Sequence, residues 1–473
     1  FRALGVVTDK DILEHIVYDT SHKESLAICK ILEPSLRSYS KIHSKSQAFD
    51  YIRNCCIAPI YDIEEFSDAD YKNLSSKVPA VKKKFEAKYE KYLKDKSQKD
   101  YYENIYIVDA LNRCFLPHVG NDFSKKAFYF GYMTNQLIST SLGLKKPTDR
   151  DSYLNKRVHI SGLLIAALFR DLYFRFKNDI IYSINKIYAL DSIKYKNGLN
   201  DIVKLIDSSN VYKLFKSKII DEGFIRAFKT CWNLKGTTCE DWQKGVVQDL
   251  NRLSYVGSTS HLRRIHTPIP KGAKIRAPHS LHLTTWGMFC PTESPDGANI
   301  GIIKHLSLTS TITFGCNSRN IRKCIKQLGL IGLLEIGINY IYYLPKVFVN
   351  GDLVGVHKNP KKFVEQLRTL RRNAKINIYT SINWNIQNNE IQINTDEGRC
   401  CRPVYIVNNN KLMITRDHIE KLDSSESYGW FNLIGGDKEY NEYSCEYKCP
   451  EKGEDLIKNM GVIEYLDVNE SDS

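Results

Sequence analysis

The chain has 473 residues, of which 42% are hydrophobic and 26% are charged, a composition that excludes a disordered protein and predicts about three or four folded domains. Lys and Arg number 68 against 54 Asp and Glu, giving a net charge of +14. This surplus fits a polyanionic partner such as nucleic acid, although it is also common in proteins that have none. The longest apolar run, Leu163–Phe169, is far shorter than the roughly 18 residues of a membrane span, so we expect no membrane partner.

Cysteine spacing predicts free or buried thiols in a reducing compartment. The 13 cysteines include adjacent pairs at 55–56 and 400–401, and Cys445 and Cys449 have no second pair nearby. There is no C-x-x-C motif, and these spacings suit neither a common zinc site nor an ordinary disulfide. The chain begins at Phe1 rather than Met and ends in an acidic segment, so we expect both ends to be cut from a longer protein.

The first 231 residues carry helical patterns. Asp9–Tyr18 has apolar residues at helical spacing, and Ser124 could cap a second helix that runs to Leu137. The pattern continues through residues 163–176. The lysine-rich stretch 81–96 has aromatic residues at helical spacing, which favours a solvated amphipathic helix over a nucleic-acid patch.

Strand patterns replace helical ones beyond Trp232. Residues 302–313 alternate and are β-branched, which predicts a strand, and residues 376–378 and 391–393 look like further strands. Val347–Val356 predicts a hairpin, because Asn350-Gly351 supplies two turn residues that tolerate positive φ. A short basic helix is expected at 363–372. Together these patterns predict an α+β multidomain protein.

One window, residues 250–292, contains no Asp or Glu. At the chain's average it should hold about five, yet it holds six Lys or Arg residues. A surface without carboxylates suits phosphate groups, because a carboxylate there would repel them. Prolines flank residues 271–276, so this part is expected to be an exposed loop that presents cations. The alternative is a chance gap in acids over a structural loop.

A rigid, turn-rich loop follows at residues 290–301, with two prolines, two glycines, Glu293 and Asp296. Paired carboxylates can bind a metal or share a proton. No third ligand is near, so a carboxylate that orients basic side chains or caps backbone amides is preferred. The Asp68/Asp70 and Asp149/Asp151 pairs are weak metal candidates, and nucleotide-loop, zinc-protease and serine-hydrolase motifs are absent.

At these two segments the chain resembles a known family. Residues 250–268, LNRLSYVGSTSHLRRIHTP, resemble the fork of second-largest subunits of multisubunit DNA-directed RNA polymerases, the counterpart of bacterial β. Residues 282–307, HLTTWGMFCPTESPDGANIGIIKHLS, are similar to the family block H-x-x-x-[WY]-G-x-x-C-P-x-E-T-P-E-G. Weaker matches span nearly the whole chain, among them Asp149–Asp151 with Lys156-Arg157 and Asp396–Arg399 with Arg402-Pro403. The eukaryotic polymerase II type, or that of a large DNA virus, is nearest.

The resemblance implies a division into a helical lobe at 1–157, a second protrusion segment at 158–231, a loop-rich fork at 232–313 and mixed α/β external domains at 314–473. It also implies that the fork faces downstream DNA and the RNA–DNA hybrid. The implied nucleic-acid-binding residues are Arg263, Arg264, Lys271, Lys274, Arg276, His279, Glu293, Asp296, Ala298 and Asn299. Two departures from the family are Asp296, where Glu is usual, and His279, where Arg is common.

The resemblance further implies the partners and cofactors. The partners are a larger subunit, smaller subunits, template DNA, the hybrid and ribonucleoside triphosphates. Mg²⁺ would be held by the larger subunit and Zn²⁺ by a segment beyond this chain, so we expect no catalytic or metal residue here and no activity of the chain alone. The location would be the nucleus in a cell, or host cytoplasm or virion for a virus.

Two other interpretations come from the residues themselves. The acid-free window fits a non-catalytic basic module that binds nucleic acid on its own. A magnesium-dependent nuclease that uses Glu293 and Asp296 is the weaker alternative.

Overall fold

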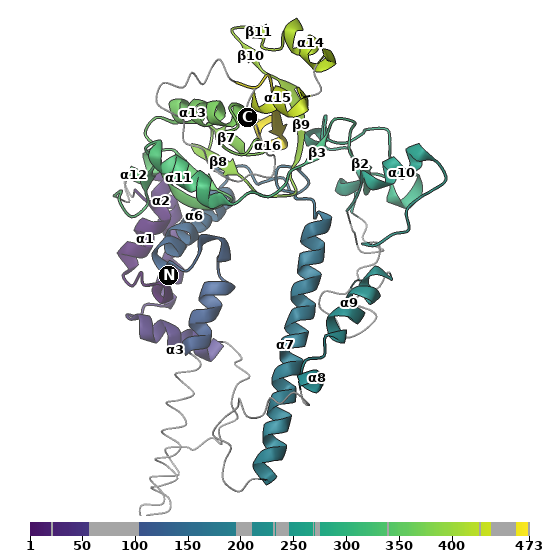
Figure 1. Ribbon diagram of the computed structural model, residues 1–473. Coiled ribbons are helices and arrows are strands. Elements are labelled where there is room, and N and C mark those ends of the chain that lie inside the picture. The colour runs from purple at the N-terminus through teal and green to yellow at the C-terminus, as the bar shows by residue number, and fades with distance from the viewer. Residues whose placement is uncertain are drawn as a thin grey trace, which may run out of the picture. The chain divides into compact units, whose positions relative to one another are not determined.

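A computed structural model describes residues 1–19, 22–55, 104–194, 211–229, 232, 246–267, 269, 275–337, 340–424, 427–436 and 460–471 (Figure 1). The chain divides into two compact units. The first comprises Phe1–Arg150, Cys316–Thr395 and Val404–Ser473, and the second comprises Asp151–Gly315 and Asp396–Pro403. Both contain helices and β-strands, which confirms the α+β expectation. Within the described ranges no helix has the length and apolarity that crossing a membrane requires.

The first unit begins with helices. They are α1 (Asp9–Val17), α2 (Lys23–Ser38), α3 (Lys45–Cys55), a helical stretch at 104–113 and α6 (Phe123–Ser141). The buried side chains of Ile12, Ile16 and Val17 from α1 pack with Ile28 of α2 and Ile138 of α6. The apolar spacing of the sequence therefore marks the face that forms this core.

Capping explains where two of these helices begin. The Thr8 hydroxyl accepts a hydrogen bond from the Asp11 amide at 3.1 Å, so α1 starts where its pattern predicts. The prediction that Ser124 caps α6 is wrong. Asp122 is the cap, and its carboxylate accepts hydrogen bonds from the amides of Ser124 and Lys125 at 3.0 and 3.5 Å. A carboxylate at this position also interacts favourably with the positive end of the helix.

A five-stranded sheet forms the centre of the first unit. Its strand order is β4-β6-β5-β8-β7, with β5 and β8 parallel and the other pairs antiparallel. The strands are β4 (Ile331–Gly332), β5 (Lys346–Val349), β6 (Asp352–Val356), β7 (Ser381–Asn385) and β8 (Glu390–Asn394). The predicted hairpin is confirmed as β5 and β6, since Asn350 and Gly351 have φ of 52° and 80°.

Helices cover both faces of this sheet. Val347 and Val349 point to α11 (Ser318–Gln327) and α13 (Pro360–Arg372), where Phe363 and Leu367 are fully buried. Between the two valines, Phe348 points to the opposite face and packs with Tyr18, Phe128 and Ile341, the last in α12 (Tyr340–Tyr343). This alternation is the period of two that a strand buried on both faces requires.

The C-terminal part of the first unit is tied to α13 by a buried ion cluster. It contains β10 (Val407–Asn408), β11 (Lys411–Leu412), α14 (Arg416–Ser424), α15 (Trp430–Gly435), β12 (Ile463–Asp467) and α16 (Val468–Ser471). Arg371 of α13 lies 2.9 Å from Glu464 and 2.7 Å from Glu470, and Arg372 lies 2.8 Å from Glu464. The two carboxylates neutralise a guanidinium that is otherwise removed from water, which makes this cluster sensitive to the loss of either partner.

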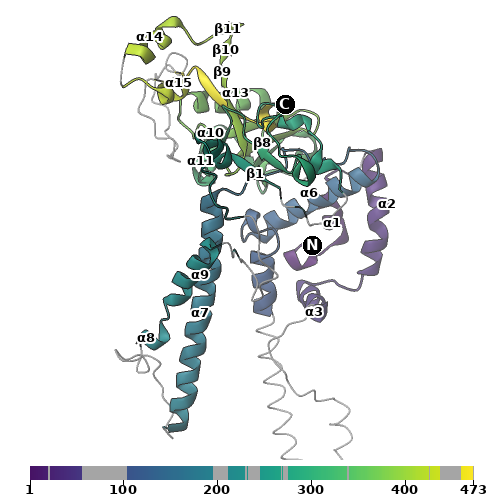
Figure 2. The same ribbon diagram turned by 90° about the vertical axis from the view of Figure 1, so that its right-hand side faces the viewer.

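A long helix, α7 (Ser161–Lys194), begins the second unit, as the helical pattern at 163–176 predicts. In both views α9 (Lys218–Phe228) lies alongside it, and the short α8 (Val211–Leu214) lies beside α7 next to the start of α9 (Figures 1 and 2). Leu168 and Leu172 of α7 pack against Ala227 of α9 and against Trp232. The pair is therefore held by an apolar seam.

The rest of the second unit is loop-rich. It contains α10 (Tyr255–Leu262), β1 (Arg264–His266), β2 (Ile303–His305), β3 (Thr311–Ile312), part of β9 (Cys400–Tyr405) and the short 3₁₀ turns Ala277–His279, Leu283–Thr285 and Gly297–Asn299. The prediction of a single strand at 302–313 is wrong, because a turn at Ser307–Ser310 separates β2 from β3. The prediction of a strand at 376–378 is also wrong: Ile376 and Ile378 are buried in an irregular segment, so burial rather than strand pairing produced their pattern.

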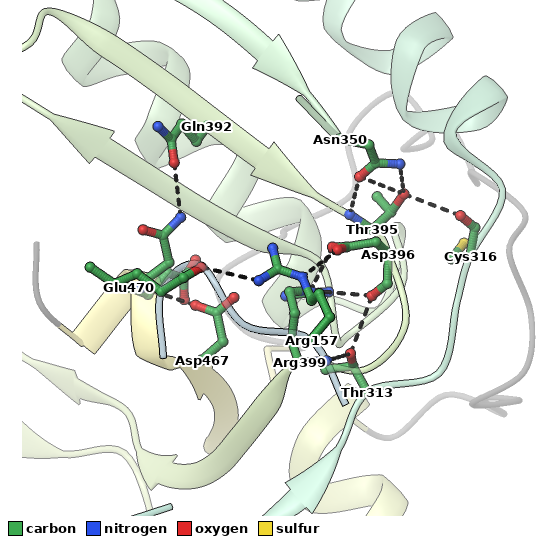
Figure 3. Close-up of polar contacts among 12 residues, drawn as sticks. Arg157, Thr313, Cys316, Asn350, Gln392, Thr395, Asp396, Arg399, Asp467 and Glu470 are labelled. Carbon is green, nitrogen blue, oxygen red and sulfur yellow. Dashed lines mark hydrogen bonds and ion pairs between the residues drawn. The ribbon is translucent and has the colours of Figure 1, made fainter. Parts of the chain in front are cut away.

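Three chain segments of the second unit meet around Asp396 (Figure 3). Arg157 donates to the Asp396 carboxylate at 2.5 Å, and Arg399 lies 2.9 Å from its other oxygen. The Thr313 amide donates to the Arg399 carbonyl at 2.8 Å, and the Val158 amide donates to the Gly398 carbonyl at 2.8 Å. This junction fixes the segment that leads into α7 and the end of β3.

Several predictions fall outside the described residues. They concern the lysine-rich stretch 81–96, the Asp68/Asp70 pair, the Cys445/Cys449 pair, and the site candidates Lys271 and Lys274.

Candidate nucleic-acid interface

A two-stranded ribbon joins the acid-free segment to the proline-bracketed loop. Strand β1 pairs antiparallel with β2, in a register that sets Arg264 opposite His305 and His266 opposite Ile303. The Thr267 amide extends the ribbon by donating to the Ile302 carbonyl at 3.1 Å. Two segments about 40 residues apart in sequence are therefore adjacent in space, on one short ribbon.

The same two segments also meet away from the ribbon. His279 Nδ1 lies 2.8 Å from the Ile300 carbonyl oxygen. Gly301 has a φ of +70°, and a Cβ atom there would lie 2.3 Å from the His279 carbonyl oxygen. Only glycine fits such a conformation and such a close approach, so Gly301 permits the contact between the two segments.

Arg263 holds the turn that follows β2. Its Nη2 donates to the carbonyl oxygens of Ser307 and Ser310 at 2.6 and 2.9 Å, and it is half-buried. These bonds engage its guanidinium with the protein's own backbone. The phosphate contact inferred for Arg263 from the family resemblance therefore stays a prediction.

Arg264, His305 and Glu293 form a polar cluster at the base of the ribbon. Arg264 Nε lies 3.2 Å from His305 Nε2, and His305 Nδ1 lies 3.1 Å from the Glu293 carbonyl oxygen. Because a guanidinium only donates, Nε2 accepts and the ring proton is on Nδ1, which donates to Glu293. His305 is buried, while Arg264 is exposed.

Glu293 has a structural role within this cluster. Its carboxylate accepts a hydrogen bond from the Ser260 hydroxyl of α10 and lies 3.8 Å from His305 Nε2. That Glu293 orients basic side chains or caps backbone amides stays a prediction. Within the described part of the chain, no three His, Cys, Asp or Glu side chains are grouped as a metal site.

The remaining site candidates lie at the surface. Asp296 precedes the 3₁₀ turn Gly297–Asn299, which contains Ala298, and all of these residues are exposed. Arg276 is exposed at the start of the turn Ala277–His279, and His279 is half-buried. The arrangement thus presents Arg264, Arg276 and the 296–299 turn to solvent on two segments that contact each other.

Two lysines near this loop were missed by sequence reasoning. Lys156 and Lys304 place their Nζ atoms 4.9 and 5.9 Å from the centre of the Tyr153 ring, and Lys304 Nζ also donates to the Gly301 carbonyl. Burial lowers the pKa of Lys304, and the charge of Lys156 lowers it further. Asp151 lies 3.6 Å from Lys156. The spacing of these residues does not predict the group, because it forms only when two segments about 150 residues apart come together.

Cys290, at the start of the loop, was also missed as a candidate. Its Sγ lies 3.4 Å from the Thr292 hydroxyl. Hydrogen bonds from the Thr292 side chain and backbone and from the Glu293 backbone lower the pKa of the Cys290 thiol. The loop geometry therefore favours the thiolate form of this cysteine.

Comparison with known proteins identifies the family. Models of RNA polymerase Rpb2 match residues 1–159 as domain 2, 248–312 as domain 3 and 347–408 as domain 4. The three matches cover more than half of the chain, and the domain 3 match contains all ten site candidates. This agreement along the chain does not depend on any single motif.

Curated relatives agree with these matches. "DNA-directed RNA polymerase II subunit 2" of Arabidopsis thaliana is 34% identical over 94% of this chain. "DNA-directed RNA polymerase II subunit RPB2" of Encephalitozoon cuniculi is 32% identical over 100% of it, and "DNA-directed RNA polymerase subunit Rpo2" of Saccharolobus shibatae is 29% identical over 100%. The chain spans 33 to 35% of the length of these relatives. The resemblance seen in the sequence is confirmed, and the chain belongs to the family of second-largest subunits of DNA-directed RNA polymerases.

Proposed function

We propose that this chain is part of a subunit that acts in template-directed RNA synthesis as a component of a DNA-directed RNA polymerase. Its named relatives are subunits of such enzymes, and the match extends along the chain. The partners are a larger subunit, smaller subunits, template DNA, the RNA–DNA hybrid and ribonucleoside triphosphates. The location is the nucleus if the source is cellular, and the host cytoplasm or virion if it is a large DNA virus.

One observation carries this proposal for the site: the acid-free segment and the proline-bracketed loop contact each other through the ribbon and through His279 and Ile300. A nucleic acid that passes this surface meets exposed Arg264 and Arg276 without a carboxylate from residues 250–292. Guanidinium groups bind phosphates without regard to sequence, as an enzyme that copies any template requires.

The individual residues then divide by chemistry. The basic candidates contact phosphates: Arg263, Arg264, Lys271, Lys274, Arg276 and, when protonated, His279. Glu293 orients the base of the ribbon, and Asp296, Ala298 and Asn299 lie beside the template strand and hybrid. The lobe, protrusion, fork and external domains, with boundaries at residues 157, 231 and 313, are part of the same proposal.

The metal ions of the reaction belong elsewhere in this proposal. The described residues of this chain do not fit a metal site, because no suitable group of three donor side chains is present among them. Following the family resemblance, we assign Mg²⁺ to the larger subunit and Zn²⁺ to a segment of the subunit outside this chain. No step of the reaction is derived through either ion.

The test is purification of the full-length protein from its source with all bound proteins. We expect a larger subunit to co-purify and the complex to extend RNA on a template scaffold. Charge reversal of the exposed arginines, Arg264→Glu with Arg276→Glu, should weaken the elongation complex, and the loss should be larger at low salt than at high salt. Arg416→Glu, at an exposed arginine of α14 in the first unit, is the matched control.

Each alternative has its own outcome in this test. A monomeric protein without RNA synthesis would refute the proposal. If residues 232–313 bound DNA while the complex made no RNA, the non-catalytic binding module would be favoured. Magnesium-dependent cleavage of DNA that Asp296→Ala abolishes would favour the nuclease.

A further inference from the structure

Three almost fully exposed apolar side chains lie on two segments of the second unit that meet at Gly287. Leu283, Trp286 and Leu308 are 91%, 81% and 94% exposed. The Ser307 amide and hydroxyl donate to the carbonyl oxygens of Met288 and Gly287 at 3.0 and 2.7 Å, which sets Leu308 beside this glycine. Single exposed apolar residues are common on a protein surface, but such a group indicates an interaction site.

The turn that carries two of these side chains is held by internal hydrogen bonds. The Trp286 amide donates to the Leu283 carbonyl at 3.1 Å, and side chains three apart in a 3₁₀ turn lie on the same side. The Thr284 amide donates to the His282 ring, and the Thr285 hydroxyl donates to the His282 carbonyl. Leu283 and Trp286 are thus presented to solvent by a turn that is already ordered.

Arg402 lies against the same glycine. A Cβ atom at Gly287 would fall 2.1 Å from Arg402 Nη1, so the guanidinium occupies space that only glycine leaves free. Arg402 is half-buried, and its Nε is buried without a hydrogen-bond partner among the described residues. Residues 250–292 contain no carboxylate that could neutralise it. Because Arg402 is only half-buried, a carboxylate from outside could pair with its guanidinium.

We propose that Leu283, Trp286, Leu308 and Arg402, which we call the Trp286 surface, dock a protein segment that carries a carboxylate beside an apolar side chain. The carboxylate pairs with Arg402, and the apolar side chain covers Trp286 and the two leucines. Trp and Arg are the residues that most often dominate protein–protein interfaces. A phosphate backbone would satisfy Arg402 but would leave both leucines in water, so nucleic acid is the less favourable occupant.

That this segment belongs to another part of the polymerase rests on the proposed function. The experiment tests the docking surface and the proposed function separately. A photo-crosslinking amino acid replaces Leu283 in the full-length subunit, and the purified complex is irradiated and analysed by mass spectrometry. We expect a crosslinked peptide of the complex that contains Asp or Glu close to an apolar residue. The same amino acid at Leu412 of β11, which is also exposed, is the control for non-specific reaction.

Variants of Arg402 make the test specific. Arg402→Gln should reduce the crosslink at position 283 by about tenfold, and Arg402→Lys should retain most of it, because the positive charge remains. A crosslink to nucleic acid, a peptide without a carboxylate, no crosslink, or an unchanged yield in Arg402→Gln would each overturn the inference. RNA synthesis by the same preparation reports separately on the proposed function.

Discussion

His279 Nδ1 lies 2.8 Å from the carbonyl oxygen of Ile300, and this contact ties the acid-free segment to the proline-bracketed loop. Because a carbonyl oxygen only accepts, the Nδ1 proton is donated to it, which leaves Nε2 as the other polar atom of the ring. In this chain the side chain fixes the loop, and exposed Arg276, three residues earlier, carries a permanent charge.

Replacement of Gly301 should separate these two segments. Gly301→Ala places a Cβ atom 2.3 Å from the His279 carbonyl oxygen at a φ of +70°, whereas Gly297→Ala has a similar φ of +77° and nothing within 4 Å. Both variants carry the strain of positive φ, about 1 kcal/mol, but only Gly301→Ala also clashes with backbone, so it should cost about 2–4 kcal/mol. Denaturant unfolding of the purified subunit measures this, and equal losses in the two variants would contradict it.

Replacing Arg263 should chiefly lower stability, whereas replacing Arg264 should chiefly change the salt dependence of DNA binding. Arg263→Gln removes bonds to the Ser307 and Ser310 carbonyls and should lower the free energy of unfolding by about 1–3 kcal/mol. Arg264→Gln removes an exposed cation and should reduce the slope of log K for DNA binding against log salt by about one. The measurement is binding of the assembled complex across a salt series. The assignment fails if Arg264→Gln leaves the slope unchanged.

The first unit should lose stability in acid, because protonation removes the contribution of the Glu464 carboxylate. Burial raises the pKa of Glu464, but hydrogen bonds and charge from Arg372 and Arg371 lower it more, to about 2. A carboxyl group with a lowered folded-state pKa stabilises the fold above its unfolded pKa of about 4.5. That contribution, up to about 3 kcal/mol, is lost as the pH falls from about 4.5 to 2.

The matched experiment uses Glu464→Gln. Compared with the unmodified protein, this variant should be markedly less stable at pH 7 and should approach it near pH 2, where the native carboxyl becomes protonated. Urea unfolding at both pH values gives the comparison. A constant difference between the two proteins across this range would show that Glu464 does not contribute through its charge.

Cys290 should react with alkylating agents faster than an ordinary thiol near neutral pH. Hydrogen bonds from Thr292 lower the pKa of the Cys290 thiol, so a larger fraction is thiolate, the reactive form. Thr292→Val removes the side-chain bond and should slow alkylation at pH 7 but not near pH 10, where either protein is largely ionised. Peptide mass spectrometry after iodoacetamide treatment follows Cys290, with buried Cys324 as an unreactive internal control.

Local sequence was sufficient for the elements whose signals are short-range. Asn350-Gly351 predicts its hairpin because few other residue pairs adopt two successive positive φ angles, and the spacing of apolar residues predicts α1 and α13 because it must match the helical period. The same reasoning failed at residues 376–378, where burial in an irregular segment produced the alternation expected of a strand. A local pattern of apolar residues indicates which residues are buried. It does not specify the partner strand that strand pairing requires.

For the site, the sequence by itself determined the family, the absence of carboxylates from residues 250–292 and the rigid character of the loop that follows. Only the tertiary structure decided that Arg263 bonds to backbone carbonyls while Arg264 stays exposed, and that Arg402 lies against Gly287. The reason is physical: composition and turn chemistry act over a few residues, whereas the partner of a side chain is set by segments brought together from far along the chain. Arg402 and Gly287 are more than 100 residues apart, and no local pattern relates them.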